Sequence, residues 1–386
     1  MKQLDRILRY FPRKSLSNAV PTSDNVIMFL TYQGDYTCNP KAIADEMIRR
    51  ALPYELIWVV RKDLREVRQG EYPEQLHLVK RGTYEFFEAA ARAKVFVDNA
   101  HNLARIGVHK KKDQYLLQTW HGSLGIKRLD GSVVMNRKWK RLAKFSREET
   151  DYCISNSRFE TEVFHSSYWK GVPVLYYGHA RNDILFAPEE EKETIREKVR
   201  TFLGISSDQN ILLYAPTHRD NQGEGYDPLD YEEIRKALEE RFGGEWVIAL
   251  RFHSRLRKIY RQWIEGIPPF VVDATDYADM QELMIAADVG VTDYSSWLFD
   301  YILMKKPGFI LADDQDIFSK RRDFYYPLES TPFPIAANNE ALAENIRRFD
   351  EERYLQDVDA FLEEKGCIED GNASRRIADK IIELTK

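Results

Sequence analysis

The chain has 386 residues, a length that predicts about two or three domains, and its 57 Lys and Arg against 62 Asp and Glu give a formal net charge of −5. With 43% hydrophobic and 31% charged residues, the composition excludes a disordered chain, and the slight acidic excess argues against a dedicated nucleic-acid binder. The three cysteines have no paired spacing, which excludes a disulfide framework and predicts reduced thiols in the cytoplasm.

The first 20 residues are basic but lack the apolar core of a signal peptide, because Asp5, Arg6 and Arg9 interrupt it. A short amphipathic basic helix is the alternative for this segment. No run of about 18 apolar residues occurs, so the sequence predicts no membrane-spanning helix.

Short apolar strands alternate with helices from residue 25 onward. The strands expected in the first half are Asn25–Thr31, Glu55–Val60, Leu76–Val79, Ala93–Asp98, Tyr115–Thr119, Tyr152–Ser155 and Val172–Tyr176, with helices at Pro40–Ala51, Thr83–Ala91 and Arg158–Ser166. The strands expected in the second half are Ile211–Ala215, Trp246–Leu250, Phe270–Asp273, Asp288–Thr292 and Gly308–Ala312, with helices at Tyr231–Phe242, Met280–Ala286 and Ser296–Met304.

This alternation predicts βαβ units and parallel sheets that are buried on both faces. The charged helical stretch Ala187–Ser207 is the expected bridge between two α/β domains of similar size with a cleft between them. The boundary is placed after residue 195, which gives domains 1–195 and 196–386. Whether the last helix, Ser374–Leu384, packs back on the first domain stays open.

Polar motifs follow several strands, at the sheet edge where open parallel sheets bind ligands. In Gln118–Gly122, Gly122 allows a tight turn and His121 offers an imidazole suited to proton transfer near neutral pH. The alternative is a core histidine satisfied by the backbone. A histidine before a glycine at a strand end favours the functional interpretation.

Two further motifs lie in the second half. Thr217 and Arg219 follow a strand and can hydrogen-bond a phosphate or a base, although an ordinary loop is equally compatible. Arg251 and His253 follow the next strand and suit an anionic leaving group such as a pyrophosphate. Their alternative is a surface arginine and a helix-capping histidine.

The segment Val291–Asp300 is the most informative locally. A buried strand runs into Asp293, and Ser295 and Ser296 stand at the start of an apolar-periodic helix. Hydroxyl groups and free N–H groups there suit an anion, whereas a plain N-cap serine is the alternative. No metal-ligand cluster, P-loop, dinucleotide fingerprint or nucleophile elbow occurs in the sequence, so neither a metal nor a cofactor is expected.

A basic stretch, Asn136–Arg147, holds six basic residues and no acidic one. If it is helical, Trp139, Leu142 and Phe145 form a narrow apolar stripe, as in an interfacial helix on an anionic membrane. A helix packed on the domain with a solvated basic face is the alternative. The membrane-contact candidates are Arg137, Lys138, Trp139, Lys140, Arg141 and Lys144.

Taken together, these motifs resemble the CDP-glycerol glycerophosphotransferase family of teichoic acid and capsule synthesis. The resemblance rests on QTWHG at Gln118–Gly122, YAPTHRD at Tyr214–Asp220, LRFH at Leu250–His253 and TDYSS at Thr292–Ser296, followed by Phe299-Asp300 and Lys306-Pro307. Weaker support comes from Asn39-Pro40-Lys41, the RND motif Arg181–Asp183 and the segment Asp370–Ser374. It covers the chain from about residue 25 to the end.

The resemblance implies a GT-B-like pair of Rossmann-type domains, with residues 1–195 on the acceptor side and residues 196–386 binding a CDP-alditol. By motif, His121 is similar to the acceptor-activating base, and His253 to a pyrophosphate contact or leaving-group stabiliser. Thr217, Arg219, Arg251, Asp293, Ser295 and Ser296 are then donor or phosphate ligands, and Gly122, Ser123, Arg181, Asn182 and Asp183 are acceptor-side or loop candidates.

The implied reaction transfers glycerol phosphate, or a related alditol phosphate, from CDP-glycerol to a hydroxyl of a polyprenyl-diphosphate-linked saccharide at the cytoplasmic face of the membrane, and it releases CMP. The chain is most similar to short, primase-like members. It departs from the family at Ser123-Leu124, Ser254 and Ala180, where the family often has Thr-Pro, Pro and Pro. The alternatives are a nucleotide-sugar glycosyltransferase of the same architecture, a non-catalytic carbohydrate- or lipid-binding scaffold, and, from the basic stretch alone, a nucleic-acid binder.

Overall fold

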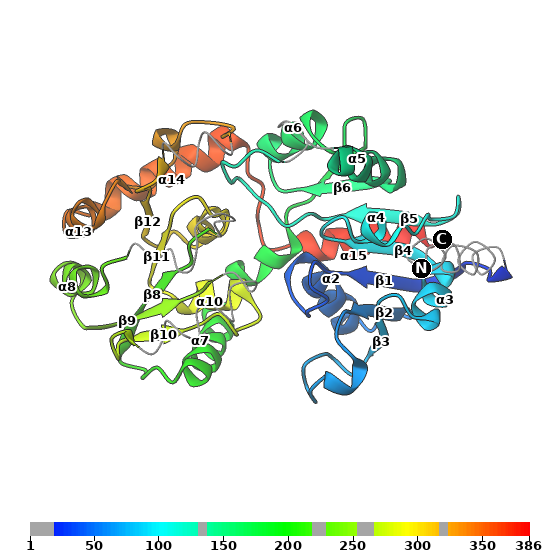
Figure 1. Ribbon diagram of the computed structural model, residues 1–386, viewed down its shortest axis with the longest axis horizontal. Helices are drawn as coiled ribbons and strands as arrows, with labels where there is room; N and C mark the ends of the chain where they lie inside the picture. The colour runs from blue at the N-terminus through cyan, green and yellow to red at the C-terminus, as the bar shows by residue number, and fades with distance from the viewer. Residues whose placement is uncertain (1–18, 130–136, 218–228, 253–265, 316–322) are drawn as a thin grey trace. The chain divides into compact units, whose positions relative to one another are not determined.

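The computed structural model describes residues 19–129, 137–217, 229–252, 266–315 and 323–386. The chain divides into two compact units (Figure 1). Unit 1 comprises Met1–His121, Leu129–Asp183 and Ile368–Lys386, and unit 2 comprises Gly122–Arg128 and Ile184–Cys367. The chain therefore passes between the units after residues 121, 128, 183 and 367, whereas the sequence predicted a single passage after residue 195.

Unit 1 is built on a seven-stranded parallel sheet in the order β3-β2-β1-β4-β5-β6-β7. Its strands are β1 (Ser23–Leu30), β2 (Glu55–Val60), β3 (Leu76–Lys80), β4 (Ala93–Asp98), β5 (Tyr115–Gln118), β6 (Tyr152–Ser155) and β7 (Val174–Tyr176). Its helices are α2 (Cys38–Arg49), α3 (Tyr84–Arg92), α4 (Asn102–Ile106), α5 (Arg137–Glu149), α6 (Arg158–Ser166) and α15 (Ala373–Leu384), and short 3-10 turns span Leu64–Glu66 and Ala180–Phe186.

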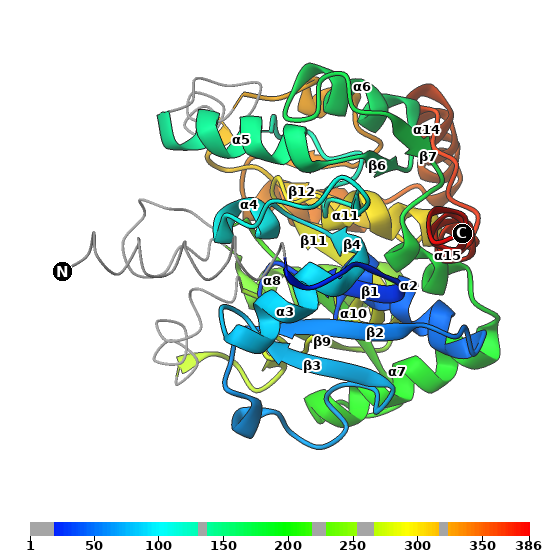
Figure 2. The ribbon, with the colours of Figure 1, turned by 90° about the vertical axis from the view of Figure 1, so that its right-hand side faces the viewer.

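The sheet of unit 1 carries an apolar core on each face. Alternate side chains of β1 divide between the faces, so Ile27 and Phe29 enter one core while Val26 and Met28 enter the other. The first core is covered by α2 together with α15, which lies beside α2 in both views (Figures 1 and 2). The final helix, whose packing the sequence left open, is thus part of unit 1.

Unit 2 is built on a six-stranded parallel sheet in the order β10-β9-β8-β11-β12-β13. Its strands are β8 (Gln209–Tyr214), β9 (Glu245–Leu250), β10 (Val271–Asp273), β11 (Val289–Thr292), β12 (Gly308–Leu311) and β13 (Ile335–Ala336). Its helices are α7 (Glu189–Leu203), α8 (Tyr231–Phe242), α10 (Met280–Ala286), α11 (Trp297–Tyr301), α13 (Asn339–Arg347) and α14 (Glu351–Lys365), and 3-10 turns span Ile302–Met304 and Leu328–Ser330.

The segment Gly122–Arg128 begins at the last residue of the QTWHG motif and packs within unit 2. Leu124 and Ile126 are fully buried there. The Ile126 carbonyl accepts a 2.8 Å hydrogen bond from the Tyr325 amide, and Lys127 pairs with Phe324 in an antiparallel bridge. Gly122 and Ser123, predicted on the acceptor side, therefore belong to the unit that holds the donor candidates.

All strands predicted from the sequence are present, and the fold class of two parallel-sheet α/β domains is confirmed. Strand β13 and helices α4, α13 and α14 were not predicted. Among the described residues, no helix is long and apolar enough to cross a membrane.

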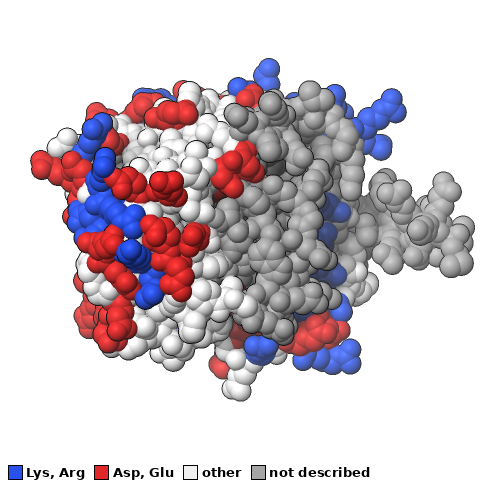
Figure 3. Space-filling view, turned by 60° about the vertical axis from the view of Figure 1, so that its left-hand side comes forward, with Lys and Arg blue, Asp and Glu red and all other residues white. Residues whose placement is uncertain are grey.

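Several charged side chains on the surface of unit 2 form ion pairs. Arg347 lies 2.9 Å from Glu233, and Arg235 lies 2.9 Å from Glu239. Lys and Arg are interspersed with Asp and Glu on the face drawn in Figure 3. Such surface pairs contribute little to stability, and the described part of that face presents no single-sign field.

Candidate active site

The QTWHG motif forms a strained loop at the carboxyl end of β5. Trp120 has φ = 50°, in the left-handed region that non-glycine residues rarely adopt. The side chain of Gln118 supports this turn, because its Oε1 accepts a 2.9 Å hydrogen bond from the Trp120 amide. A conformation of this kind persists where the surroundings hold it, and such residues cluster at functional sites.

Asn39, at the start of α2, holds the same loop from the other side. Its Nδ2 donates to the carbonyl groups of Thr119 at 3.1 Å and of Trp120 at 3.2 Å, and its Oδ1 accepts from the Arg181 amide at 3.0 Å. Asn39 is 1% exposed, so these bonds replace water completely. The sequence noted Asn39 as weak family support but did not predict this contact.

The hydrogen bond of His121 defines its tautomer. Its Nδ1 lies 2.5 Å from the Asn99 carbonyl oxygen, which can only accept, so Nδ1 carries the proton and donates. In the neutral ring, Nε2 then holds the free lone pair. The ring stacks near Trp120, with centroids 4.2 Å apart. In this arrangement Nε2 is the ring nitrogen that can accept a proton.

The electrostatic surroundings keep His121 neutral. Partial desolvation lowers the pKa of its imidazole, and the positive charges of Arg181 and Arg105 lower it further, against the opposing effect of the Asn99 hydrogen bond. The His121 side chain is also in contact with water, which offsets part of this desolvation, but the lowered pKa still leaves the ring uncharged at pH 7.

A second histidine lies behind Trp120. His101 is 2% exposed, and its ring contacts those of Trp120, Tyr168 and Trp169 at centroid distances of 5.3, 4.6 and 5.4 Å. Its Nδ1 lies 2.9 Å from the Ser146 hydroxyl of α5, and its Nε2 has no partner among the described residues. His101 was not among the candidate residues that the sequence motifs indicated.

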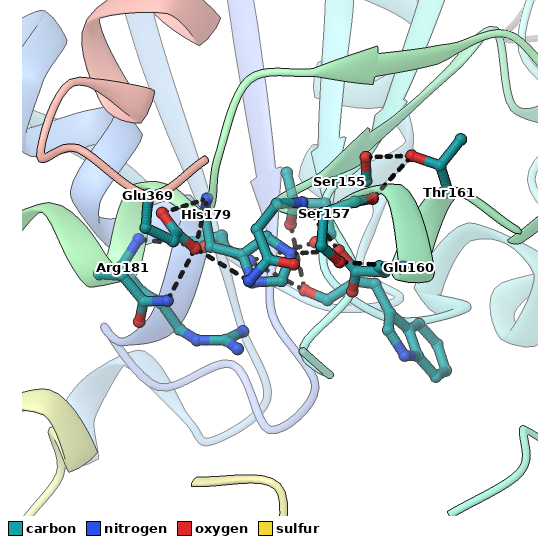
Figure 4. A network of polar contacts seen from close by, with 12 residues as sticks. Ser155, Ser157, Glu160, Thr161, His179, Arg181 and Glu369 are labelled. Atoms are coloured by element: carbon teal, nitrogen blue, oxygen red, sulfur yellow. Dashed lines mark hydrogen bonds and ion pairs between the residues drawn. The ribbon is translucent and has the colours of Figure 1, made fainter. Parts of the chain in front are cut away.

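The RND motif forms a polar joint with the C-terminal segment (Figure 4). The Asp183 carboxylate accepts from the amides of Ala373 at 2.9 Å and Ser374 at 2.7 Å, which caps the N-terminus of α15. Asn182 donates to Glu369 at 3.0 Å. The side chains of Asn182 and Asp183 thus make structural contacts that the sequence did not predict.

A buried histidine–glutamate contact completes the joint. His179 Nε2 and Glu160 Oε2 are 2.8 Å apart, and the two side chains are 0% and 2% exposed. Figure 4 shows this pair and Glu369 converging on the start of the RND turn. Arg181, 7% exposed, contributes its amide to Asn39 and its positive charge to the surroundings of His121.

In unit 2, the donor candidates gather at the carboxyl ends of β8 and β11. Asp293 Oδ1 accepts from the amides of Thr217 at 2.8 Å and Tyr294 at 2.5 Å, so the carboxylate fixes the backbone of both loops. Ser296 is the N-cap of α11 but makes no side-chain cap hydrogen bond. The predicted N-cap alternative, in which Ser295 caps the helix, is therefore not what is seen.

The segment Gly122–Arg128 reaches the same place. A Cβ at Gly125 would lie 2.7 Å from the Cβ of Ser296, so this approach requires glycine. Lys127 Nζ lies 3.4 Å from the Thr217 hydroxyl. Lys127 was not among the candidate residues from the sequence, because its position four residues beyond Ser123 gave no signal for a contact across 90 residues.

Of the remaining donor candidates, only Arg251 lies within the described residues. The Arg251 guanidinium donates to the carbonyls of Tyr277 at 2.8 Å and Ala278 at 3.4 Å, which positions it at the end of β9. His253 and Arg219 lie outside the described residues. Within the part of the chain that is described, no group of three or more His, Cys, Asp or Glu side chains could hold a metal ion.

The basic stretch is a helix, α5, that packs on unit 1. Ser146 is buried and bonds to His101, and the Phe145 ring lies 4.5 Å from that of His109. The exposed basic residues of α5 are Arg137, Lys140, Arg141, Lys144 and Arg147, and Lys138 and Trp139 lie on the same helix. The helix is thus packed on its domain and also presents a basic face.

Comparison with known proteins decides the family. A model described as CDP-glycerol:poly(glycerophosphate) glycerophosphotransferase matches residues 13–383. The chain belongs to this family. It is 32% identical over 389 residues to the teichoic acid poly(glycerol phosphate) polymerase of Staphylococcus epidermidis, with 95% of this chain and 52% of that protein covered. The chain thus spans about half of that relative's length.

Other relatives match over nearly their full length. The teichoic acid glycerol-phosphate transferase of Staphylococcus aureus is 30% identical over 375 residues, with 92% of each chain covered. A solved structure of the wall teichoic acid polymerase TagF superimposes with a TM-score of 0.84 at 30% identity, covering 100% of this chain and 95% of that one. The glycerophosphotransferase resemblance predicted from the motifs is confirmed.

Proposed function

We propose that this glycerophosphotransferase moves glycerol phosphate from CDP-glycerol to a hydroxyl of a lipid-linked saccharide or polymer, in teichoic acid synthesis. The observation that carries the proposal is the tautomer of His121, whose Nδ1–H is held by the Asn99 carbonyl and whose Nε2 is left as a base. The family match over residues 13–383 supports the donor, since relatives act in glycerol phosphate transfer.

In the proposed reaction, Nε2 of His121 accepts the proton of the acceptor hydroxyl as its oxygen attacks the β-phosphorus of the donor. The bond from that phosphorus to the bridging oxygen breaks, and CMP leaves with the electron pair. The backbone that Asp293 fixes, together with Lys127 and the hydroxyl groups of Ser295 and Ser296, binds the phosphates. Arg251 and His253 stabilise the leaving group. Positioning and charge stabilisation supply most of the catalysis in phosphoryl transfer.

The test is CMP release from CDP-glycerol in the presence of a lipid-linked disaccharide analogue, with mass spectrometry of the product. His121→Ala should abolish release while the fold survives, and His165→Ala, an exposed histidine of α6, is the matched control. Near wild-type turnover in His121→Ala would remove the proposed role. Product mass also counts the units added, which distinguishes a polymerase from a primase or single transferase.

Parallel reactions with CDP-ribitol and common UDP-sugars address the alternative of a nucleotide-sugar glycosyltransferase. A product with a UDP-sugar and none with a CDP-alditol would favour that alternative. If the folded protein turned over none of these donors, a binding scaffold would be favoured.

We also propose that α5 brings the protein to an anionic membrane surface, where a polyprenyl-linked acceptor resides. The exposed basic residues of the helix support this, because each basic group near an anionic surface contributes about 1 kcal/mol. Arg141→Glu with Lys144→Glu should weaken sedimentation with phosphatidylglycerol liposomes by tenfold or more. The charge-matched control reverses the exposed Lys236 and Arg348 of unit 2. Equal binding by both double variants would refute the role of α5.

A further inference from the structure

One buried amide connects the two loops from which the chain leaves unit 1. Asn39 donates to the carbonyls of Thr119 and Trp120 and accepts from the amide of Arg181. The first loop ends at His121, after which the chain enters unit 2, and the second ends at Asp183, after which it enters unit 2 again. The side-chain oxygen and nitrogen of Asn39 are both engaged, at 1% exposure.

The geometry of Trp120 makes these bonds consequential for its neighbour. A residue with φ = 50° relaxes toward negative φ unless contacts on both sides of it prevent the change. Gln118 holds the amide of Trp120, and Asn39 holds its carbonyl, so the peptides before and after Trp120 are each held by a side chain. Loss of the Asn39 bonds leaves the Trp120 carbonyl with only the longer 3.4 Å hydrogen bond from the Thr119 hydroxyl, so the peptide that leads into His121 can rotate more easily.

Rotation of this peptide would move the His121 ring relative to its surroundings. The groups around the ring are the Asn99 carbonyl, the rings of Trp120 and Tyr32, and the charges of Arg105 and Arg181. The hydrogen bond from His121 Nδ1 to the Asn99 carbonyl can persist after such a change. It holds the imidazole ring at one atom only, so the ring can still pivot about that bond.

We propose that Asn39 is a positioning residue, which orients His121 for catalysis and links its orientation to the RND loop. This inference rests on the proposed function for the role of His121, but the orientation itself can be measured without turnover. A purely structural Asn39 would stabilise unit 1 without affecting the position of the His121 ring.

The kinetic test compares Asn39→Asp with Asn345→Asp. Asparagine 345 also donates its amide to a backbone carbonyl, that of Ile335 at 3.0 Å, but it lies in α13 of unit 2. Asn39→Asp should lower kcat by about tenfold to a hundredfold, as expected for a catalytic group displaced by about 1 Å, with KM for CDP-glycerol changed less than about twofold. An equal loss in both variants, or a loss confined to KM, would overturn the proposal.

The second readout needs no substrate. In protein with 13C-labelled histidine Cε1, the His121 resonance, assigned by its absence in His121→Ala, reports ring protonation as pH is varied. In Asn39→Leu, which removes the same hydrogen bonds without adding a charge, the midpoint should move up toward the ordinary value near 6.5, because the displaced ring becomes better solvated and moves away from Arg181 and Arg105. An unchanged midpoint and line shape would overturn the proposal. If the wild-type protein turned over no CDP-glycerol but this midpoint still moved, the proposed function would fail while the positioning role stood.

Discussion

Stability at low pH should depend on His101. Its ring is 2% exposed and is packed among three aromatic rings, so a charge on it has no water to solvate it. Burial, then the positive charge of Arg105 and that of His121 when it is protonated, lowers the pKa of His101 to about 3. In the unfolded chain the pKa of a histidine is about 6.5.

The sign and size of the effect follow from this difference. Below pH 6.5 the unfolded chain binds a proton that the folded protein does not, so folding stability is present above that pH and falls progressively as pH drops toward 3. Between pH 7 and pH 5 the loss amounts to about 2 kcal/mol, since each pKa unit corresponds to about 1.4 kcal/mol.

The assay is chemical denaturation at pH 7 and pH 5, followed by tryptophan fluorescence, on the wild-type protein and on His101→Phe. Phenylalanine keeps the ring packing, removes the titrating group and removes the unpartnered Nε2. The wild-type protein should lose about 2 kcal/mol more than the variant between the two pH values. The control is His165→Phe on the exposed face of α6. If His101→Phe lost as much as the wild-type protein, the buried-neutral explanation would be refuted.

Two further changes test the joint and the donor side. Asp183→Ala should lower the free energy of unfolding by about 2 kcal/mol and increase hydrogen exchange in α15, because the helix loses a charged group that caps its N-terminus. Asp183→Asn should retain part of that cap. Equal rates of hydrogen exchange in α15 of the wild-type protein and both variants would contradict this prediction. Lys127→Ala should raise KM for CDP-glycerol about tenfold by removing a cation beside Thr217, with Lys170→Ala as an exposed control. An unchanged KM would show that Lys127 does not contribute to donor binding.

The strands were predictable because their signal is local. Apolar runs such as Val26–Leu30 are buried on both faces of a parallel sheet, and turn residues mark their ends. Helix α14 was missed although its signals were present, since Asp350 caps its first turn and Gly366 ends it with φ = 63°. The segment is rich in charged residues and no predicted strand follows it, so it did not belong to the alternation of strands and helices from which the other helices were predicted.

The packing of Gly122–Arg128 was not predictable by the same means. Leu124 and Ile126 are apolar and separated by one residue, but nothing in seven residues indicates which of two units buries them. The contacts of Asn39 have the same character, since its partners Thr119 and Arg181 lie 80 and 142 residues away. Long-range hydrogen bonds leave no periodic pattern in the sequence. A motif can therefore indicate that a residue such as Asn39 matters, but it does not reveal which groups the residue contacts.

The motif residues separate into two kinds once their hydrogen bonds are known. Lys306 was counted as family support, yet its ammonium donates to the carbonyls of Ile285 at 2.8 Å and Ala287 at 2.6 Å, and burial lowers its pKa to about 8. Such a residue serves the fold, because its donors are satisfied internally. The hydroxyl groups of Ser295 and Ser296 have no partner among the described residues, as expected of groups that bind a substrate. The hydrogen bonds of these residues, which a motif cannot encode, therefore show which of their polar groups are already used within the fold.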